Sequence, residues 1–294
     1  QLGHYSWFTS MDVDKGGNAW VGTVLDGFYV IDMHNFSVNS IIDIPLLSGK
    51  TIRNGIHSIY CDKENNAVWI GLFNQGVCYY HPSMNKLTLC NKKLLRGAWG
   101  GEEIRCMLET FGGDILMGTA QGLYRYDPKS HSMDILYKEF NQKNCRVLYE
   151  DSKKRIWVGT YHDGLYCIEA GKVRAYAYPD TDYQNELDFS NIRAIIEDPS
   201  GRLWISIYGY GGVGQFNPET GEISLLSERF PELKKYKVVN ALAIDKQSRL
   251  VVGSDNGLYI YDPAKDQIWI PEQDGQSNSI FNRGSIKYNQ ILKD

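Results

Sequence analysis

The sequence predicts an all-β protein, a β-propeller with six complete four-stranded blades and the first strand of a seventh. The main observation is a short phrase, an aromatic or aliphatic residue, then an aliphatic residue, then Gly or Ser, that occurs six times. The phrases end at Gly22, Gly71, Gly118, Gly159, Ser206 and Gly253, in steps of 49, 47, 41, 47 and 47 residues. Periods of this length with strand-like content are typical of blade arrays. In addition, helical periodicity over ten or more residues is absent.

The fifth repeat illustrates how one blade is expected to form. Residues 191–197 are apolar almost throughout, which predicts a buried first strand. Residues 198–202 predict a turn, because Pro199 fixes φ and Gly201 permits positive φ. Three further strands are expected over residues 203–208, 213–216 and 222–226. Short antiparallel strands joined by tight turns make one propeller blade.

Both ends of the sequence predict the first strand of a blade. Residues 7–13 open the first repeat, and residues 281–289 resemble the first strand of a seventh. We therefore expect residues 1–294 to be a single propeller domain, cut from a longer polypeptide in which the intact propeller has seven blades. How the blades close in this chain stays open. Short helical turns are expected near residues 184–187 and 228–236.

Composition excludes several classes of protein. The formal net charge of −4 gives no basic footprint for nucleic acid. The sequence contains no run of 18 apolar residues, so it predicts no membrane segment. The six cysteines show no CxxC or zinc spacing, and we interpret them as small buried apolar residues. Cys78 and Cys90 are expected opposite each other across a hairpin, and whether they form a disulfide is left open.

The sequence contains two motifs that only resemble ligand sites. Residues 209–214 spell GxGxxG, but a strand rather than a helix follows, which argues against dinucleotide binding. Residues 12–17 resemble a calcium loop, but the twelfth position is Thr23 instead of Glu. No HxxxH or GxSxG pattern occurs. We therefore expect no catalytic residues, no metal and no cofactor.

One recurring position suggests a binding site. Alignment of the repeats on the six phrases places Thr9, His57, Arg105, Arg146, Arg193 and Asn240 together, at the start of each innermost strand, and suggests Lys287 for the partial blade. Side chains at this position are expected at the mouth of the central channel, where arginines suit carboxylate or sulfate groups. Alternatively, each arginine pairs with an acidic neighbour such as Glu103, Glu150 or Glu197 and is purely structural.

Loops at the same end carry aromatic residues. An aromatic face with polar neighbours suits a sugar, although loop aromatics also serve protein contacts or loop packing. The candidate ligand-binding residues are His57, Trp99, Arg105, Arg146, Tyr161, His162, Arg193, Tyr208 and Tyr210.

The repeats resemble a known family. The stretches Ile156-Trp157-Val158-Gly159-Thr160-Tyr161-His162-Asp163-Gly164-Leu165-Tyr166 and Met117-Gly118-Thr119-Ala120-Gln121-Gly122-Leu123-Tyr124 are similar to two-component regulator propeller repeats. Phe281-Asn282-Arg283-Gly284-Ser285 further resembles the last blade of the second propeller in hybrid sensors of Bacteroides-type bacteria. The resemblance implies a periplasmic sensor region of an inner-membrane protein, with two seven-bladed propellers, an immunoglobulin-like domain, a membrane helix and a histidine kinase.

The same resemblance implies the function and the partners. The family senses oligosaccharides, so we expect a non-catalytic sensor propeller that senses such a ligand or helps transmit its binding. Expected partners are the neighbouring propeller and immunoglobulin-like domains of the same chain and a second copy, as a homodimer, in the intact protein. The alternatives are a propeller-type glycan lyase or glycosidase, and a scaffold for protein docking or dimerisation.

Overall fold

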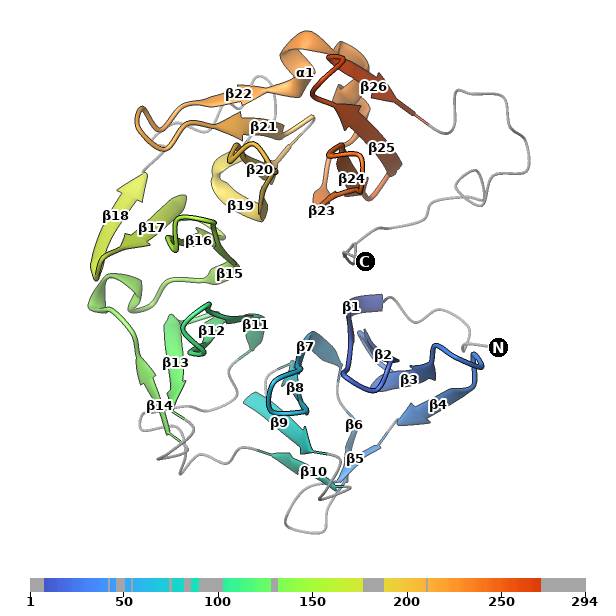
Figure 1. The fold of residues 1–294 in the computed structure, drawn as a ribbon. Helices are drawn as coiled ribbons and strands as arrows, with labels where there is room; N and C mark the ends of the chain where they lie inside the picture. The colour runs from blue at the N-terminus through green and yellow to red at the C-terminus, as the bar shows by residue number, and fades with distance from the viewer. Residues whose placement is uncertain are drawn as a thin grey trace. The chain divides into compact units, whose positions relative to one another are not determined.

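The computed structural model describes residues 8–41, 43–45, 51–53, 55–73, 76–81, 86–89, 103–127, 132–176, 188–209 and 211–270. The chain divides into two compact units, unit 1 (Gln1–Cys145) and unit 2 (Arg146–Asp294). Each unit contains three four-stranded antiparallel sheets, here numbered blades 1–6 in chain order (Figure 1). The predicted all-β propeller fold with six complete blades is confirmed. The predicted strand at residues 281–289 lies outside the described residues.

Unit 1 contains blades 1–3, and in each blade the chain runs from the first to the fourth strand in spatial order. The strands are β1 (Phe8–Val13), β2 (Asn18–Thr23), β3 (Phe28–Asp32) and β4 (Val38–Ile41) in blade 1, β7 (Ile56–Asp62), β8 (Ala67–Leu72), β9 (Gly76–His81) and β10 (Lys86–Leu89) in blade 2, and β11 (Ile104–Glu109), β12 (Ile115–Thr119), β13 (Leu123–Asp127) and β14 (Ser132–Ile135) in blade 3.

Unit 2 contains blades 4–6 with the same order of strands. The strands are β15 (Cys145–Glu150), β16 (Ile156–Thr160), β17 (Leu165–Glu169) and β18 (Lys172–Tyr176) in blade 4, β19 (Asp188–Glu197), β20 (Leu203–Tyr208), β21 (Val213–Phe216) and β22 (Ile223–Leu225) in blade 5, and β23 (Val239–Ile244), β24 (Leu250–Ser254), β25 (Gly257–Asp262) and β26 (Gln267–Trp269) in blade 6.

The core of each unit lies between consecutive blades. Trp204 of blade 5 packs among apolar residues of blade 6 and lies 5.5 Å from the ring of Tyr261. Trp157 of blade 4 contacts Phe216 of blade 5 in the same way, also at 5.5 Å. The tryptophans of these two repeat phrases are therefore buried between neighbouring blades.

Four of the glycines that end a phrase, Gly22, Gly71, Gly118 and Gly159, leave no room for a Cβ atom in this packing. A Cβ atom on Gly71 would lie 2.4 Å from Ser58 Oγ and 2.7 Å from the carbonyl oxygen of Ile104 in the next blade. In blade 5, Ser206 takes the place of Gly and donates a hydrogen bond of 3.0 Å to the carbonyl of Val239. The repeated Gly thus permits the close approach of two blades.

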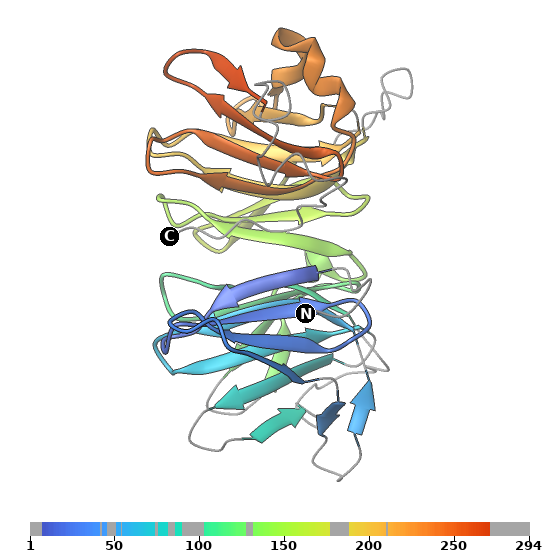
Figure 2. The same ribbon diagram turned by 90° about the vertical axis from the view of Figure 1, so that its right-hand side faces the viewer.

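Three segments depart from the four-stranded repeat. A two-stranded hairpin, β5 (Asp43–Pro45) and β6 (Thr51–Arg53), was not predicted from the sequence. A single 3₁₀ turn, η1 (Lys138–Phe140), was also not expected. Between blades 5 and 6, helix α1 (Leu226–Arg229) and the 3₁₀ helix η2 (Pro231–Lys235) lie on the outer side of these blades, away from their first strands (Figures 1 and 2). This agrees with the helical turns predicted near residues 228–236.

Candidate ligand-binding site

The candidate position lies on a β-bulge. In β19, Ile192 pairs with Ile207 and Ala194 pairs with Ser206, so Arg193 has no partner in the register. The same one-residue shift occurs in the first strands of four other blades, where the extra residues are Thr9, His57, Arg105 and Asn240. A bulge redirects the side chain of the extra residue and is over-represented near functional sites.

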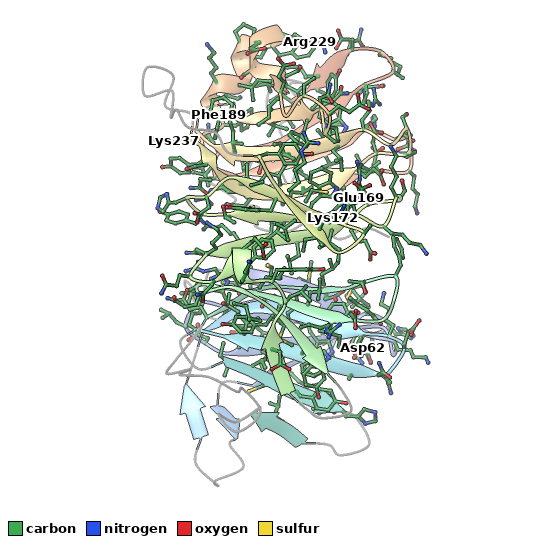
Figure 3. The ribbon with its side chains drawn as sticks, turned by 90° about the vertical axis from the view of Figure 1, so that its left-hand side faces the viewer. Asp62, Glu169, Lys172, Phe189, Arg229 and Lys237 are labelled. Atoms are coloured by element: carbon green, nitrogen blue, oxygen red, sulfur yellow. The ribbon has the colours of Figure 1, made fainter. Side chains whose placement is uncertain are left out.

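We call the end of a blade that carries this bulge its bulge end, and the opposite end its turn end. In unit 2, Phe189 near the start of β19 and Lys237 just before β23 lie at one end of the strands, whereas Glu169 and Lys172 of the β17–β18 hairpin lie at the other (Figure 3). The start of each first strand therefore marks the bulge end, where the sequence placed the candidate residues.

Arg193 is held by two neighbours at the bulge end of unit 2. Its Nη1 donates a hydrogen bond of 2.6 Å to Oδ1 of Asn240, the corresponding residue of blade 6. Its Cζ lies 5.2 Å from the ring centroid of Tyr208, at the end of the second strand of its own blade. Such a cation–π contact orients the guanidinium. The structure thus brings together two of the predicted site residues, Arg193 and Tyr208, and adds Asn240.

Arg146 occupies the same repeat position in blade 4 and has the same type of neighbour. Its Cζ lies 5.1 Å from the ring centroid of Tyr161. The ring of His162 lies 3.9 Å from that of Tyr161, centroid to centroid. The structure therefore brings Arg146, Tyr161 and His162 together, so blades 4 and 5 carry equivalent arginine–tyrosine pairs.

The two candidate residues of unit 1 that the structure describes have different neighbours. The imidazole of His57 lies 4.6 Å from the ring of Phe73, centroid to centroid, in blade 2. In blade 3, Nη2 of Arg105 forms an ion pair of 2.6 Å with Glu103, as the structural alternative predicted. The position after β12 in blade 3 is Ala120, so no aromatic ring stands beside Arg105 at this point of the repeat.

Trp99, Tyr210 and Lys287 lie outside the described residues, as does Cys90, on which the question of a Cys78–Cys90 disulfide depends. The sequence interpretation missed Asn191, two residues before Arg193. Asn191 is 3% exposed, and its Oδ1 accepts no hydrogen bond from the described residues. A buried acceptor of this kind requires a donor such as water or a ligand hydroxyl. The signal available in the sequence was the recurrence of Asn two residues before Arg, as Asn144 before Arg146 and Asn191 before Arg193.

The Gly-rich loop that spells GxGxxG is part of the scaffold. The backbone N–H groups of Gly209 and Gly211 donate to the carbonyls of Lys237 and Tyr236, at 3.2 and 2.9 Å. Gly211 has φ +69°, and a Cβ there would lie 2.5 Å from Cβ of Ser227 in α1. These amides hold the loop against the segment that follows η2, instead of forming a phosphate cradle.

Burial raises the pKa of the Cys106 thiol to about 12 and that of Cys167 to about 11, so both thiols are protonated at neutral pH. Within the described ranges, no group of three or more His, Cys, Asp or Glu residues could hold a metal ion. None of the helices in this part of the chain has the length and hydrophobicity that a membrane crossing needs.

Comparison with known proteins identifies the repeat. Residues 139–162 and 186–209 match the family model of the two-component regulator propeller. Each matched segment contains one whole arginine–tyrosine pair, Arg146 with Tyr161 in the first and Arg193 with Tyr208 in the second. A search of the curated proteins found no match.

Solved structures share the fold. The extracellular domain of a protein described as a hybrid two-component system, from B. thetaiotaomicron, is 16% identical with a TM-score of 0.50. The match covers 89% of this chain and 40% of that domain, so the chain spans less than half the length of this relative. Virginiamycin B lyase from Staphylococcus aureus is 13% identical with a TM-score of 0.65, over 89% of this chain and 83% of the lyase. At these identities the similarities concern the fold alone.

Proposed function

The chain carries two-component regulator propeller repeats, and from this we infer that it is a non-catalytic sensor propeller of a hybrid two-component signalling protein. In this proposal it senses an oligosaccharide, or helps transmit the binding of one, in the periplasm. The proposed partners are a neighbouring propeller and an immunoglobulin-like domain of the same inner-membrane protein, and a second copy in a homodimer.

The observation that carries the proposal is the bulge at one repeat position. Five first strands contain an extra residue at this position. In a regular antiparallel ladder, every residue would instead face a residue of the neighbouring strand. In blades 4 and 5 this position belongs to arginines that lie over tyrosines. A scaffold that presents cations and aromatic rings in adjacent blades fits recognition of a small polar ligand.

Calorimetric titration of the chain with a panel of oligosaccharides tests the proposal, with the complete periplasmic region as a second sample. We expect at least one oligosaccharide to bind without being cleaved. Cleavage of the bound glycan by the purified chain would instead support the lyase or glycosidase alternative. If no member of the panel binds either sample, the sensor proposal for oligosaccharides is wrong.

A docking scaffold is a second candidate, which exposed aromatic residues on turns of unit 1 favour. Phe36 is 71% exposed with φ 58°, and Phe111 is 72% exposed. Positive φ is uncommon for a bulky residue and is often associated with a functional contact. Light scattering over a range of concentrations tests this candidate: association that Phe36→Ser and Phe111→Ser abolish would favour it over the sensor.

A further inference from the structure

Two asparagines at one repeat position have buried side-chain oxygens. Asn144 and Asn191 each lie two residues before the arginine at the aligned position of their blade. Asn191 is 3% exposed, and the Oδ1 atoms of both residues are buried. Within the part of the chain that the structure describes, neither oxygen accepts a hydrogen bond. A buried acceptor without a donor is destabilising, so native proteins supply one.

Asn191 lies in the seam between blades 4 and 5, where seam means the contact of two consecutive blades. Before it, the carbonyl of Ser190 accepts a hydrogen bond of 2.9 Å from the backbone N–H of Gly164 in blade 4. After it, Ile192 packs so closely on blade 4 that a Cβ on Gly159 would lie 2.7 Å from its Cγ2. The seam is therefore closed on both sides of Asn191, which explains why its side chain is buried.

The first strand of blade 5 bends to bring Asn191 into this seam. In the register of β19 with β20, three residues of β19 are accommodated between two adjacent residues of β20, Tyr208 and Ile207. Such an irregularity bends a strand and redirects its side chains. The bend contains Phe189, which lies at the bulge end of unit 2 (Figure 3), as well as Asn191. Asn191 therefore belongs to the same end of unit 2 as the candidate ligand-binding residues.

The hydroxyl group of the facing hairpin in blade 4 is already engaged. Thr160 Oγ1 donates a hydrogen bond of 2.7 Å to the carbonyl of Gly164. The same oxygen accepts a hydrogen bond of 2.9 Å from the backbone N–H of Asp163. The proton of this hydroxyl is thus used inside the hairpin, so the donor for Asn191 has to come from a bound molecule.

Asn144 repeats the arrangement against blade 3, within unit 1. Before it, the backbone N–H of Gln142 donates a hydrogen bond of 2.8 Å to the carbonyl of Gln121, in the hairpin of blade 3. After it, Cβ of Cys145 would lie 3.2 Å from a Cβ on Gly118. Two seams therefore hold an asparagine oxygen between the same pair of contacts with the preceding blade.

The asparagine is not a general requirement of the seams. In blade 2 the equivalent residue is Gly55, where a Cβ would lie 2.0 Å from the carbonyl oxygen of Val24, so no side chain fits. In blade 3 it is Glu103, which forms the ion pair with Arg105. In blade 6 it is Val238. The buried amide is thus specific to the seams before the first strands of blades 4 and 5.

We propose that Asn144 and Asn191 each bind one O–H donor in their seam, either an internal water molecule or, at the bulge end of unit 2, a hydroxyl group of the ligand. The acceptor selects this class, because an amide oxygen receives a proton donor and has nothing to offer a carboxylate or sulfate. The ligand source rests on the proposed function as an oligosaccharide sensor, whereas the water source does not.

Crystal structures of the full chain test the inference, grown without sugar and with maltotetraose or tetragalacturonate. We expect an oxygen atom within about 3.0 Å of Oδ1 of both Asn144 and Asn191. A water molecule in the sugar-free crystal identifies the internal source. A sugar hydroxyl at Asn191 that appears only in the crystal with sugar identifies the ligand source.

A variant of Asn191 measures what the oxygen contributes. Asn191→Leu removes the acceptor but keeps a side chain of similar size. If the donor is a ligand hydroxyl, the variant binds the tetrasaccharide about tenfold more weakly in calorimetry. If the donor is internal water, the affinity is unchanged and the water is missing from the crystal structure of the variant. Gln215→Leu, which removes an exposed amide from β21, is the control and changes neither result. Circular dichroism verifies the fold of both variants.

The outcomes separate this inference from the proposed function. The inference is overturned by crystals, with and without sugar, in which no water or sugar hydroxyl lies within hydrogen-bond distance of either Oδ1. Oligosaccharide binding in calorimetry would then still leave the sensor proposal standing. Conversely, water at both asparagines without binding of any oligosaccharide would support the inference and contradict the sensor proposal.

Discussion

The indole Nε1 of Trp157 donates a hydrogen bond of 2.8 Å to Oδ2 of Asp151, and both side chains are fully buried. Asp151 begins the turn between the first and second strands, and Trp157 lies in the second strand. The pair therefore joins the turn of blade 4 to the packing between blades 4 and 5. Trp20 with Asp14 and Trp204 with Asp198 form the same hydrogen bond at 2.8 and 3.0 Å.

Trp157→Ala should destabilise the protein strongly, because it empties a fully buried site between blades. We expect a loss of about 3–5 kcal/mol in the free energy of unfolding, measured by chemical denaturation. Trp269→Ala is the control: Trp269 is 41% exposed, so a loss below about 1 kcal/mol is expected. An unchanged midpoint for Trp157→Ala would contradict the assignment of the blade core.

Asp151→Ala should cost more stability than Asp245→Ala. Both carboxylates pair with the arginine four residues later, at 2.6 and 2.7 Å. Asp151 additionally accepts a hydrogen bond from the indole of Trp157. In blade 6 the equivalent position is Val251, so Asp245 accepts no indole hydrogen bond from that position. We expect losses of about 3 kcal/mol for Asp151→Ala and about 1 kcal/mol for Asp245→Ala. Equal losses in denaturation experiments would show that the indole bond contributes nothing.

Gly71→Ala should destabilise the contact between blades 2 and 3, because the new Cβ would overlap Ser58 Oγ and the carbonyl of Ile104. We expect a loss of at least about 1–3 kcal/mol. Gly112→Ala is the matched control, since the nearest atom to its Cβ would be 3.6 Å away and a change within about 0.5 kcal/mol is expected. A neutral Gly71→Ala in thermal unfolding would argue against the close approach of the blades.

Two neighbouring aspartates should respond to pH in opposite directions. Burial raises the pKa of Asp14, but hydrogen bonds from Trp20, Asn18 and Gly16 outweigh it and hold the pKa below its usual value. Its stabilising contribution is therefore complete above about pH 5 and is lost as the pH falls through the folded-state pKa. Burial raises the pKa of Asp12 above its usual value, despite hydrogen bonds from Cys61 and Val13. Its contribution is present at low pH and is lost as the pH rises through the raised pKa.

Denaturation of Asp14→Asn and Asp12→Asn across the acidic range measures these two effects. The cost of Asp14→Asn should shrink as the pH falls from about 7 to about 3, whereas Asp12→Asn should become relatively more favourable as the pH rises. The same sign of pH dependence for both variants would contradict the assigned environments of the two carboxylates.

The sequence predicted the blades because each repeat is a complete structural unit with its own turn signals. It also placed the candidate residues at one position, since the spacing to the Gly of the phrase is preserved from Arg105 to Asn240. The bulge itself could not be predicted: an extra residue shifts the alternation of faces, but in β19 Ala194, Ile195 and Ile196 are apolar on both faces, so the shift leaves no mark in the residue pattern. In blade 2 the turn from Asp62 to Trp69 is one residue longer than from Asp151 to Trp157. Trp69 Nε1 accordingly has no hydrogen-bond partner among the described residues.

The neighbours of the arginines were only partly predictable. Arg105 forms the predicted ion pair with Glu103, whereas Glu197 accepts hydrogen bonds from the backbone N–H and Oγ of Ser152, at 2.7 and 2.8 Å. Tyr161 and Tyr208 each follow their arginine by 15 residues, a spacing visible in the sequence. That the guanidinium lies over the ring depends on side-chain rotamers, which sequence patterns do not specify.

The central claim is that the ligand binds at the bulge end of unit 2, and NMR of the arginine side chains tests it most directly. The Nε–H signals of the isotope-labelled chain are followed while the oligosaccharide that binds most tightly in calorimetry is added. We expect the signals of Arg146 and Arg193 to shift with saturation, and those of Arg155 and Arg202, which are ion-paired to Asp151 and Asp198, to stay in place. Shifts confined to Arg155 and Arg202, with Arg146 and Arg193 unchanged at saturation, would contradict the claim.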